Sequence, residues 1–243
     1  MFNVLESAVP IECWSCSIGH THSTLFCPHC SKIQPPPGGD YFQVFGLQRG
    51  FEIDLGALET EFHRLSRKVH PDRFARATES ERQFSLADTA LLNDAYRTLK
   101  DPIARTQYLL TLEGIQLEEQ SKAATDAARA SGQQKKQVVP PELLEEVFEL
   151  NMQLAEMRAA KQMGEHPEEE PELRRNLMTA KDSFDEKMVE TQAELEALWS
   201  TWDVALDAGD QATQTAARDA MVVLLNKRTY LRNLVRDVNE ALE

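Results

Sequence analysis

Apolar residues recur at helical spacing through most of the chain. After Asp54 they follow one another at intervals of three and four residues, as Leu55, Leu58, Phe62, Leu65 and Val69. This spacing predicts an α-helix with one apolar face, and Asp54 is of the residue type that caps a helix N-terminus. The helix is predicted to end at His70, because a residue that precedes proline is disfavoured in the α region.

A second helix is predicted from about Thr78 to Leu99, ended by Asp101-Pro102 and followed by a short helical piece from Ile103 to Leu112. Its expected core residues are Leu91, Leu92, Ala95 and Leu99. The two long helices should lie antiparallel with a polar loop between them, and this loop presents three residues at its tip: His70, Pro71 and Asp72.

Three further helices are predicted towards the C-terminus, over 141–163, 172–208 and 211–242. Short breaks between them imply antiparallel neighbours in a three-helix bundle. The core stripe of the first of these helices is Leu143, Val147, Leu150, Leu154 and Met157. On the last helix we expect Leu224, Leu231, Val235 and Val238 in the core, with Tyr230 pointing elsewhere, and Trp199 and Trp202 in the bundle core.

The first bundle helix carries a second apolar stripe, which consists of Leu144, Phe148 and Met152. A helix in a bundle needs only one broad apolar face, so this stripe is surplus to packing. Acidic residues border it: Glu145, Glu149 and Glu156. An exposed apolar patch rimmed by acids is typical of a protein-binding site. The alternative is that the bundle or another domain covers this face.

All four cysteines lie near the N-terminus, in the pattern Cys13-x-x-Cys16 and Cys27-x-x-Cys30. Two such knuckles supply four thiolates to one tetrahedral zinc ion, a structural site without an open position. Metal binding would supply the folding free energy that so small a module lacks. The alternatives are disulfides, an iron–sulfur cluster, or ligation by one of the neighbouring histidines His20, His22 and His29.

The fold class is therefore mainly α, with a small N-terminal zinc-knuckle module. The expected divisions are the module (1–34), a linker (35–40), the helical hairpin domain (41–114), a connecting segment (115–139) and the bundle (140–243). No apolar stretch is long enough to span a bilayer, and the N-terminus lacks a targeting signal. We expect a bacterial cytoplasmic protein, or a mitochondrial matrix protein if a presequence has been removed.

The net charge of the chain limits the classes of macromolecule that it can bind. The 243 residues include 26 basic and 40 acidic side chains, a formal net charge of −14. This balance disfavours nucleic acid, which is bound mainly through clustered Lys and Arg. The acidic excess gathers between Pro140 and Ser200, whereas Arg64, Arg67 and Lys68 make a local basic face on the first long helix.

A basic helix face, a His-Pro-Asp loop and an antiparallel helix together resemble the J domain of DnaJ-like co-chaperones. More closely, the chain from Tyr41 onwards resembles the HscB (Jac) family, and the cysteine knuckles resemble those of some of its members. The matching motifs are Tyr41-Phe42-Gln43-Val44-Phe45-Gly46-Leu47, Phe51-x-Ile53-Asp54, His70-Pro71-Asp72-Arg73-Phe74, Asn93-x-Ala95-Tyr96-x-x-Leu99, Pro102, Arg105 and Tyr108-Leu109-Leu110-x-Leu112-x-Gly114.

The resemblance implies a non-enzymatic co-chaperone that stimulates the ATPase of a DnaK/HscA-type chaperone and delivers an IscU-type iron–sulfur scaffold protein to it. It assigns stimulation to His70, Pro71 and Asp72, and chaperone docking to Arg64, Arg67, Lys68 and Arg73. Arg73 stands where relatives often have Lys. The alternatives are a J protein with a different client and a zinc-module adaptor without a chaperone role; a homodimer is left open.

The resemblance also assigns scaffold binding to the second apolar stripe. The implied residues are Leu144, Phe148, Glu149, Met152 and Tyr230. Glu145 stands where relatives commonly have Met, and Met152 where they often have an acidic residue. These two departures concern the details of the contact and not its location.

Overall fold

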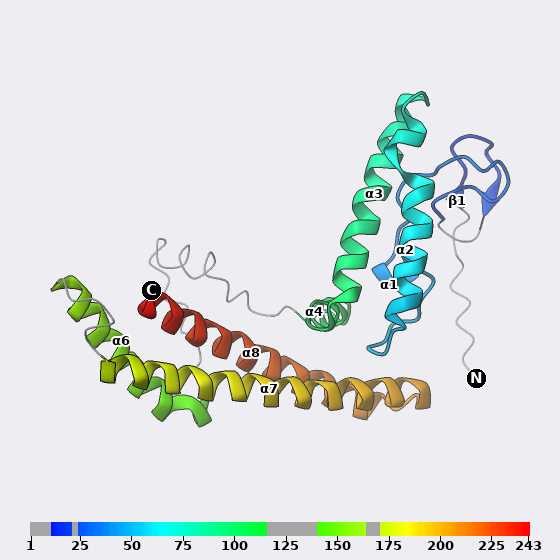
Figure 1. Cartoon of the computed structure of the whole chain (residues 1–243). Helices are drawn as coiled ribbons and strands as arrows, with labels where there is room; N and C mark the ends of the chain where they lie inside the picture. The colour runs from blue at the N-terminus through cyan, green and yellow to red at the C-terminus, as the bar shows by residue number, and fades with distance from the viewer. Residues whose placement is uncertain (1–10, 21–23, 116–139, 164–170) are drawn as a thin grey trace. The chain divides into compact units, whose positions relative to one another are not determined.

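The computed structural model describes residues 11–20, 24–115, 140–163 and 171–243. The described part is mainly helical, as the sequence predicts, with one small antiparallel sheet of β1 (Ile11–Glu12) and β2 (Gly19–His20) in the cysteine module (Figure 1). The chain divides into two compact units, Met1–Glu113 and Gly114–Glu243. Each is described by itself.

The first unit joins the cysteine module to a set of helices that follow the predicted order. These are α1 (Tyr41–Val44), α2 (Leu55–Val69), the 3-10 turn η1 (Pro71–Phe74), α3 (Glu79–Lys100) and α4 (Pro102–Leu112). Asp54 caps α2 by accepting the Ala57 backbone N–H, and Asp101 caps α4 in the same way through the N–H of Ala104. The local capping signals therefore set the helix starts that the sequence predicts.

The helices α2 and α3 lie side by side as an antiparallel hairpin (Figure 1). Apolar residues of both helices are buried between them: Leu58, Leu65, Val69, Leu92, Ala95 and Leu99. Phe62 stacks on Tyr96 with ring centroids 4.2 Å apart. Leu55 shares this face in the sequence pattern, but it is 47% exposed because it is the first residue of α2.

A buried carboxyl group interrupts the apolar interior of α3. Asp88 has no exposed surface, and neither of its carboxyl oxygens has a hydrogen-bond partner among the described residues. Burial without a compensating donor disfavours the ionised form, and it raises the pKa of Asp88 to about 7.

We expect Asp88→Asn to stabilise the hairpin at alkaline pH. The folded chain holds the Asp88 proton between about pH 4 and 7, where the unfolded chain has lost it, so stability declines as pH rises through this window. The amide cannot ionise, so its stabilisation relative to the wild type should grow by about 2–3 kcal/mol between pH 5 and pH 8, at about 1.4 kcal/mol per pH unit up to the folded-state pKa. Urea unfolding at both pH values measures this, and an equal effect at the two pH values contradicts it.

The second unit is a helical bundle. After a short 3-10 turn, η2 (Pro141–Leu143), it contains α6 (Leu144–Gln162), α7 (Pro171–Ala208) and α8 (Gln211–Leu242). The last two lie side by side (Figure 1). All five residues of the predicted first stripe are buried, as are Trp199 and Trp202.

Two predicted segments fall largely outside the described residues, namely the connection over 115–139 and the break over 164–167. Among the helices that the structure describes, none is both long enough and apolar enough to cross a membrane.

Candidate functional site

The four cysteine sulfurs converge in the N-terminal module. Cys13 and Cys30 have their Sγ atoms 3.7 Å apart, Cys16 and Cys27 have theirs 3.8 Å apart, and all four lie within 4.8 Å of one another. None of the four cysteines is in a disulfide, which argues against the disulfide alternative. Sulfur ligands about 2.3 Å from a tetrahedral ion are about 3.8 Å apart. The cluster therefore fits one metal ion.

The two knuckles share one backbone geometry. The residue after each second cysteine, Ser17 or Ser31, has a positive φ of 56° or 58°, and its N–H donates to the carbonyl of the first cysteine at 2.9 Å. This turn lets backbone N–H groups point at sulfur: those of Ser15 and His29 lie 3.4 Å from the Sγ atoms of Cys13 and Cys27.

These N–H groups favour a thiolate. Burial of Cys13 opposes its ionisation, but backbone N–H groups and the neighbouring thiols more than offset this and lower the pKa of Cys13 to about 6. A thiolate is the form that binds metal. His29 is exposed, as expected for a residue inside a knuckle, whereas the side chains of His20 and His22 lie outside the described residues.

Two contacts attach the cysteine module to α3. Lys32 Nζ lies 2.6 Å from Glu81 Oε1, and the Trp14 ring meets the edge of Phe84 at a centroid distance of 5.8 Å. The Lys32 hydrogen bond, followed by those from Thr78, lowers the pKa of the buried Glu81 to about 2. The module therefore belongs to the same compact unit as the hairpin.

The His-Pro-Asp loop lies at the tip of the hairpin. The helix α2 ends at Val69, whose carbonyl accepts a 2.5 Å hydrogen bond from Ser85 Oγ in α3. His70 Nδ1 accepts the Asp72 backbone N–H at 3.3 Å and lies 3.6 Å from Asp72 Oδ2. Both side chains are nevertheless exposed, at 56% and 90%. The turn holds the imidazole and the carboxylate side by side in solvent, where a partner can contact them.

The basic face of α2 leads to this tip. Arg64, Arg67 and Lys68 are all exposed, and Arg73 is exposed in the turn that follows. Arg67 Nε donates to the carbonyl of His63 at 3.0 Å. Arg64 is paired with Glu61, with its Nε 2.6 Å from Oε2, and this hydrogen bond lowers the pKa of Glu61. Part of the positive charge of the face is therefore already balanced.

The second apolar stripe of α6 is exposed within the bundle. Leu144, Phe148 and Met152 have exposed fractions of 56%, 67% and 59%, and they lie one helical turn apart. The three bordering glutamates, including Glu149, are exposed too. The bundle does not cover this face, so the patch has the composition and exposure of a binding surface.

Tyr230 lies in the core of the bundle, contrary to the expectation from the sequence. The expectation that it points away from the core is wrong, because it is only 6% exposed and belongs to the core cluster with Leu150, Leu154 and Leu231. The helix α8 packs against both α6 and α7, so it needs a broader apolar face than a single stripe. Burial also raises the pKa of Tyr230.

Three residues that shape these sites are not predicted by the sequence pattern. Glu61 could have been found from its spacing of three residues before Arg64, which favours an ion pair on a helix. Lys32 and Glu81 are 49 positions apart, and no local signal joins them.

Comparisons with known proteins agree with the motifs. The DnaJ domain family matches residues 40–108. The iron-sulfur cluster co-chaperone protein HscB of Mus musculus is 34% identical over 160 residues, which are 63% of this chain and 62% of that protein. The chain therefore spans less than two thirds of the length of this relative.

Two solved structures are similar to this chain over most of its length. The crystal structure of human co-chaperone protein HscB has a TM-score of 0.63 at 25% sequence identity, over 95% of this chain and 98% of that chain. The chaperone HscB from Vibrio cholerae has a TM-score of 0.52 at 25% identity, over 83% and 96%. Together with the DnaJ match, they confirm the resemblance that the motifs from Tyr41 onwards indicate.

Proposed function

Because the chain belongs to the HscB-type J-domain proteins, we propose that it is a co-chaperone of iron–sulfur cluster biogenesis. It stimulates the ATPase of a DnaK/HscA-type chaperone and delivers an IscU-type scaffold protein to it. Hydrolysis takes place in the chaperone, and we assign no catalytic residue to this chain.

One observation carries the proposal: two unlike exposed surfaces lie in separate compact units of one chain. The first unit presents the His-Pro-Asp tip and its basic face, and the second presents an apolar stripe rimmed by glutamates. Two exposed surfaces of unlike chemistry fit two partners of unlike chemistry. An adaptor that holds a client for a chaperone needs each of them.

The J domain is the part that meets the chaperone. The cationic side chains on α2 attract an acidic surface and orient it during the encounter. The exposed tip then offers His70 and Asp72 to the partner, and the hydrogen bond between the Asp72 N–H and His70 Nδ1 restricts the imidazole before contact. Such restriction reduces the entropy lost on docking.

The α6 stripe is the part that meets the scaffold. Leu144, Phe148 and Met152 provide apolar area, while Glu149 on the rim provides orientation through charge. Tyr230 came into this set through the family resemblance. Since its ring lies in the core, our proposal for direct contact rests on the four α6 residues. Joining both parts on one chain raises the effective concentration of scaffold at the chaperone.

We also propose that the metal of the cysteine cluster is zinc, held by Cys13, Cys16, Cys27 and Cys30. Bound zinc would supply folding free energy to the module. The mutual proximity of all four sulfurs supports a single ion, because a cluster with several irons distributes its thiolates over separate metal atoms.

Removal of the metal should unfold the module and spare the helices. After Cys16→Ser, metal analysis should find far less zinc than the single equivalent expected for the wild type. Trp14 emission should change because its contacts with Phe84 and the Ile33 carbonyl are lost, while helical circular dichroism stays nearly constant. Trp14→Phe identifies the emitting residue. Undiminished zinc in Cys16→Ser, or iron in the wild type, contradicts the assignment.

A binding experiment tests the two-partner proposal. The full chain is immobilised, and the scaffold and the ATP-bound chaperone are added singly and then together. We expect each to bind and the two to bind simultaneously. Binding of the chaperone without the scaffold would favour a J protein with another client, and binding of neither would contradict the proposal.

A further inference from the structure

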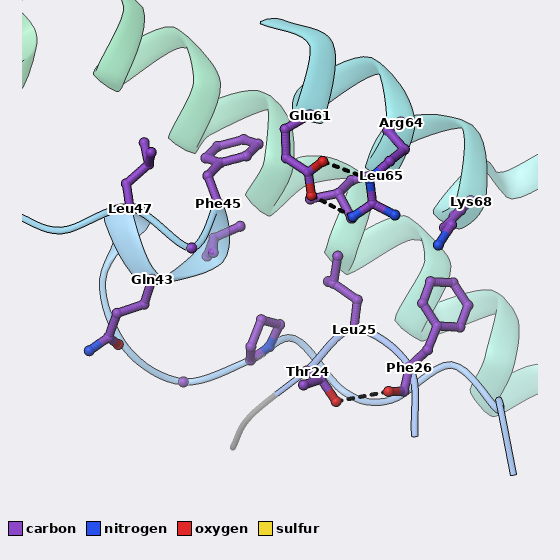
Figure 2. Close-up of a pocket in the computed structure, with 14 residues that line it drawn as sticks. Thr24, Leu25, Phe26, Gln43, Phe45, Leu47, Glu61, Arg64, Leu65 and Lys68 are labelled. Atoms are coloured by element: carbon purple, nitrogen blue, oxygen red, sulfur yellow. Dashed lines mark hydrogen bonds and ion pairs between the residues drawn. The ribbon is translucent and has the colours of Figure 1, made fainter. Parts of the chain in front are cut away.

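A groove opens between the cysteine module and the hairpin. Its volume is about 730 Å³, and it is lined by the module, the linker, the segment around α1, and α2. Figure 2 shows Leu25 pointing from the module towards Leu65 of α2, with Phe45 on another wall. These three residues are at most 8% exposed, so the floor of the groove is apolar and firmly packed.

The rim of the groove is positive. Arg64 and Lys68, both assigned to chaperone docking, line it together with Glu61. Glu61 is engaged with Arg64, whereas no ion pair of Lys68 is found among the described residues. In Figure 2 the Phe26 ring points towards Lys68. Lys68 also acts electrostatically on Glu61, but the rim has two cations and one carboxylate and is therefore positive overall. An apolar floor below such a rim suits a segment that carries an apolar side chain next to a carboxylate.

The wall of the groove that the cysteine module forms is fixed by contacts within the module and by an ion pair to α3. Phe26 directly precedes Cys27 of the metal cluster and pairs with Ile33 in an isolated β-bridge. Thr24 Oγ1 donates to the Phe26 carbonyl at 2.8 Å, and the Gln34 N–H donates to the Leu25 carbonyl at 2.9 Å. The Lys32–Glu81 ion pair attaches the module to α3. The groove is therefore preformed.

We propose that this groove receives an acidic, apolar segment of the chaperone that docks on α2, so that the cysteine module is part of the docking surface. The inference rests on the proposed function and deepens it. Two features select this occupant: the groove is continuous with the basic face through Arg64 and Lys68, and its unbalanced charge is complementary to an acid. The module thereby serves recognition as well as its own stability.

The test measures the affinity of the full chain for an ATP-bound DnaK/HscA-type chaperone. Phe26→Ala should weaken binding by about fivefold to tenfold, as for an apolar contact inside an interface. The matched control is Ile18→Ala, since Ile18 is a 45% exposed apolar residue of the same module that does not line the groove. It should leave the affinity unchanged. Zinc content and scaffold affinity should equal those of the wild type in both variants.

Two substitutions of opposite charge at Thr24 test whether the bound segment is acidic. They do not disturb the apolar floor, because the Thr24 side chain is exposed and lines the groove. Thr24→Glu should weaken docking and Thr24→Lys should strengthen it. Both lose the same hydrogen bond to the Phe26 carbonyl, and added salt should reduce the difference between them.

The outcomes separate this inference from the proposed function. If Lys68→Ala weakens docking while Phe26→Ala and the Thr24 pair have no effect, the groove is not used and the inference is overturned, although the co-chaperone proposal stands. If Ile18→Ala weakens docking as much as Phe26→Ala, or if Phe26→Ala alters self-association instead of docking, the inference is again overturned. A wild-type chain that does not dock overturns both.

Discussion

Replacing His70 by glutamine should reduce the stimulation of the chaperone ATPase at least about tenfold, which corresponds to about 1.4 kcal/mol. His70 is the C-cap residue that follows α2, and its Nδ1 accepts the Asp72 N–H, so the ring is both exposed and held beside the carboxylate. Glutamine retains a polar group but loses the planar ring and this geometry. The measurement is the steady-state ATPase of a DnaK/HscA-type chaperone at rising concentrations of the variant.

His63→Gln is the matched control for this experiment. His63 is an exposed histidine of the same helix, away from the tip, with its side chain 3.9 Å from Glu59. The same substitution there should leave stimulation within about twofold, as for an ordinary surface change. Scaffold binding should be normal in both variants. Full stimulation by His70→Gln would show that the side chain of His70 at the tip is not needed for stimulation of the ATPase.

Phe148→Ala should weaken scaffold binding by roughly thirtyfold, which corresponds to about 2 kcal/mol, the cost typical of a central aromatic residue in an interface. Phe148 is the middle residue of the α6 stripe, and it is 67% exposed, so the substitution creates no cavity in the bundle. Its effect on the unfolding free energy should stay within about 0.5 kcal/mol. Titration calorimetry with the scaffold measures the first quantity, and urea unfolding measures the second.

Val189→Ala is the control for the stripe. Val189 is 71% exposed on α7 of the same bundle, so the variant removes apolar surface elsewhere. It should leave scaffold affinity unchanged, and both variants should still stimulate the chaperone in the absence of scaffold. Equal affinities of Phe148→Ala and the wild type would show that the scaffold binds elsewhere.

Local signals in the sequence account for the elements that were predicted well. Asp54 and Asp101 act as side-chain caps in the structure, and Pro71 follows the end of α2. The two stripes of α6 were separable on a helical wheel, and the structure buries one and exposes the other. The spacing of residues along a helix is therefore sufficient to predict which of its faces is buried when one helix face packs against the bundle.

Contacts distant in sequence account for what was missed. Tyr230 is buried because α8 packs against two helices. The spacing of apolar residues within one helix does not show how many other helices pack against it. The groove lies between the hairpin and the cysteine module, and the Lys32–Glu81 and Trp14–Phe84 contacts attach that module to α3. The cysteine spacing predicted the metal cluster but gave no information about what the module packs against.

The central claim is that one chain couples a chaperone ATPase to an iron–sulfur scaffold. The most direct measurement is ATP hydrolysis by a DnaK/HscA-type chaperone with the scaffold alone, with the full chain alone, and with both. The account predicts stimulation by the chain and a larger rate with both than the sum of the separate effects. A rate that is unchanged by the chain, with or without scaffold, would contradict it.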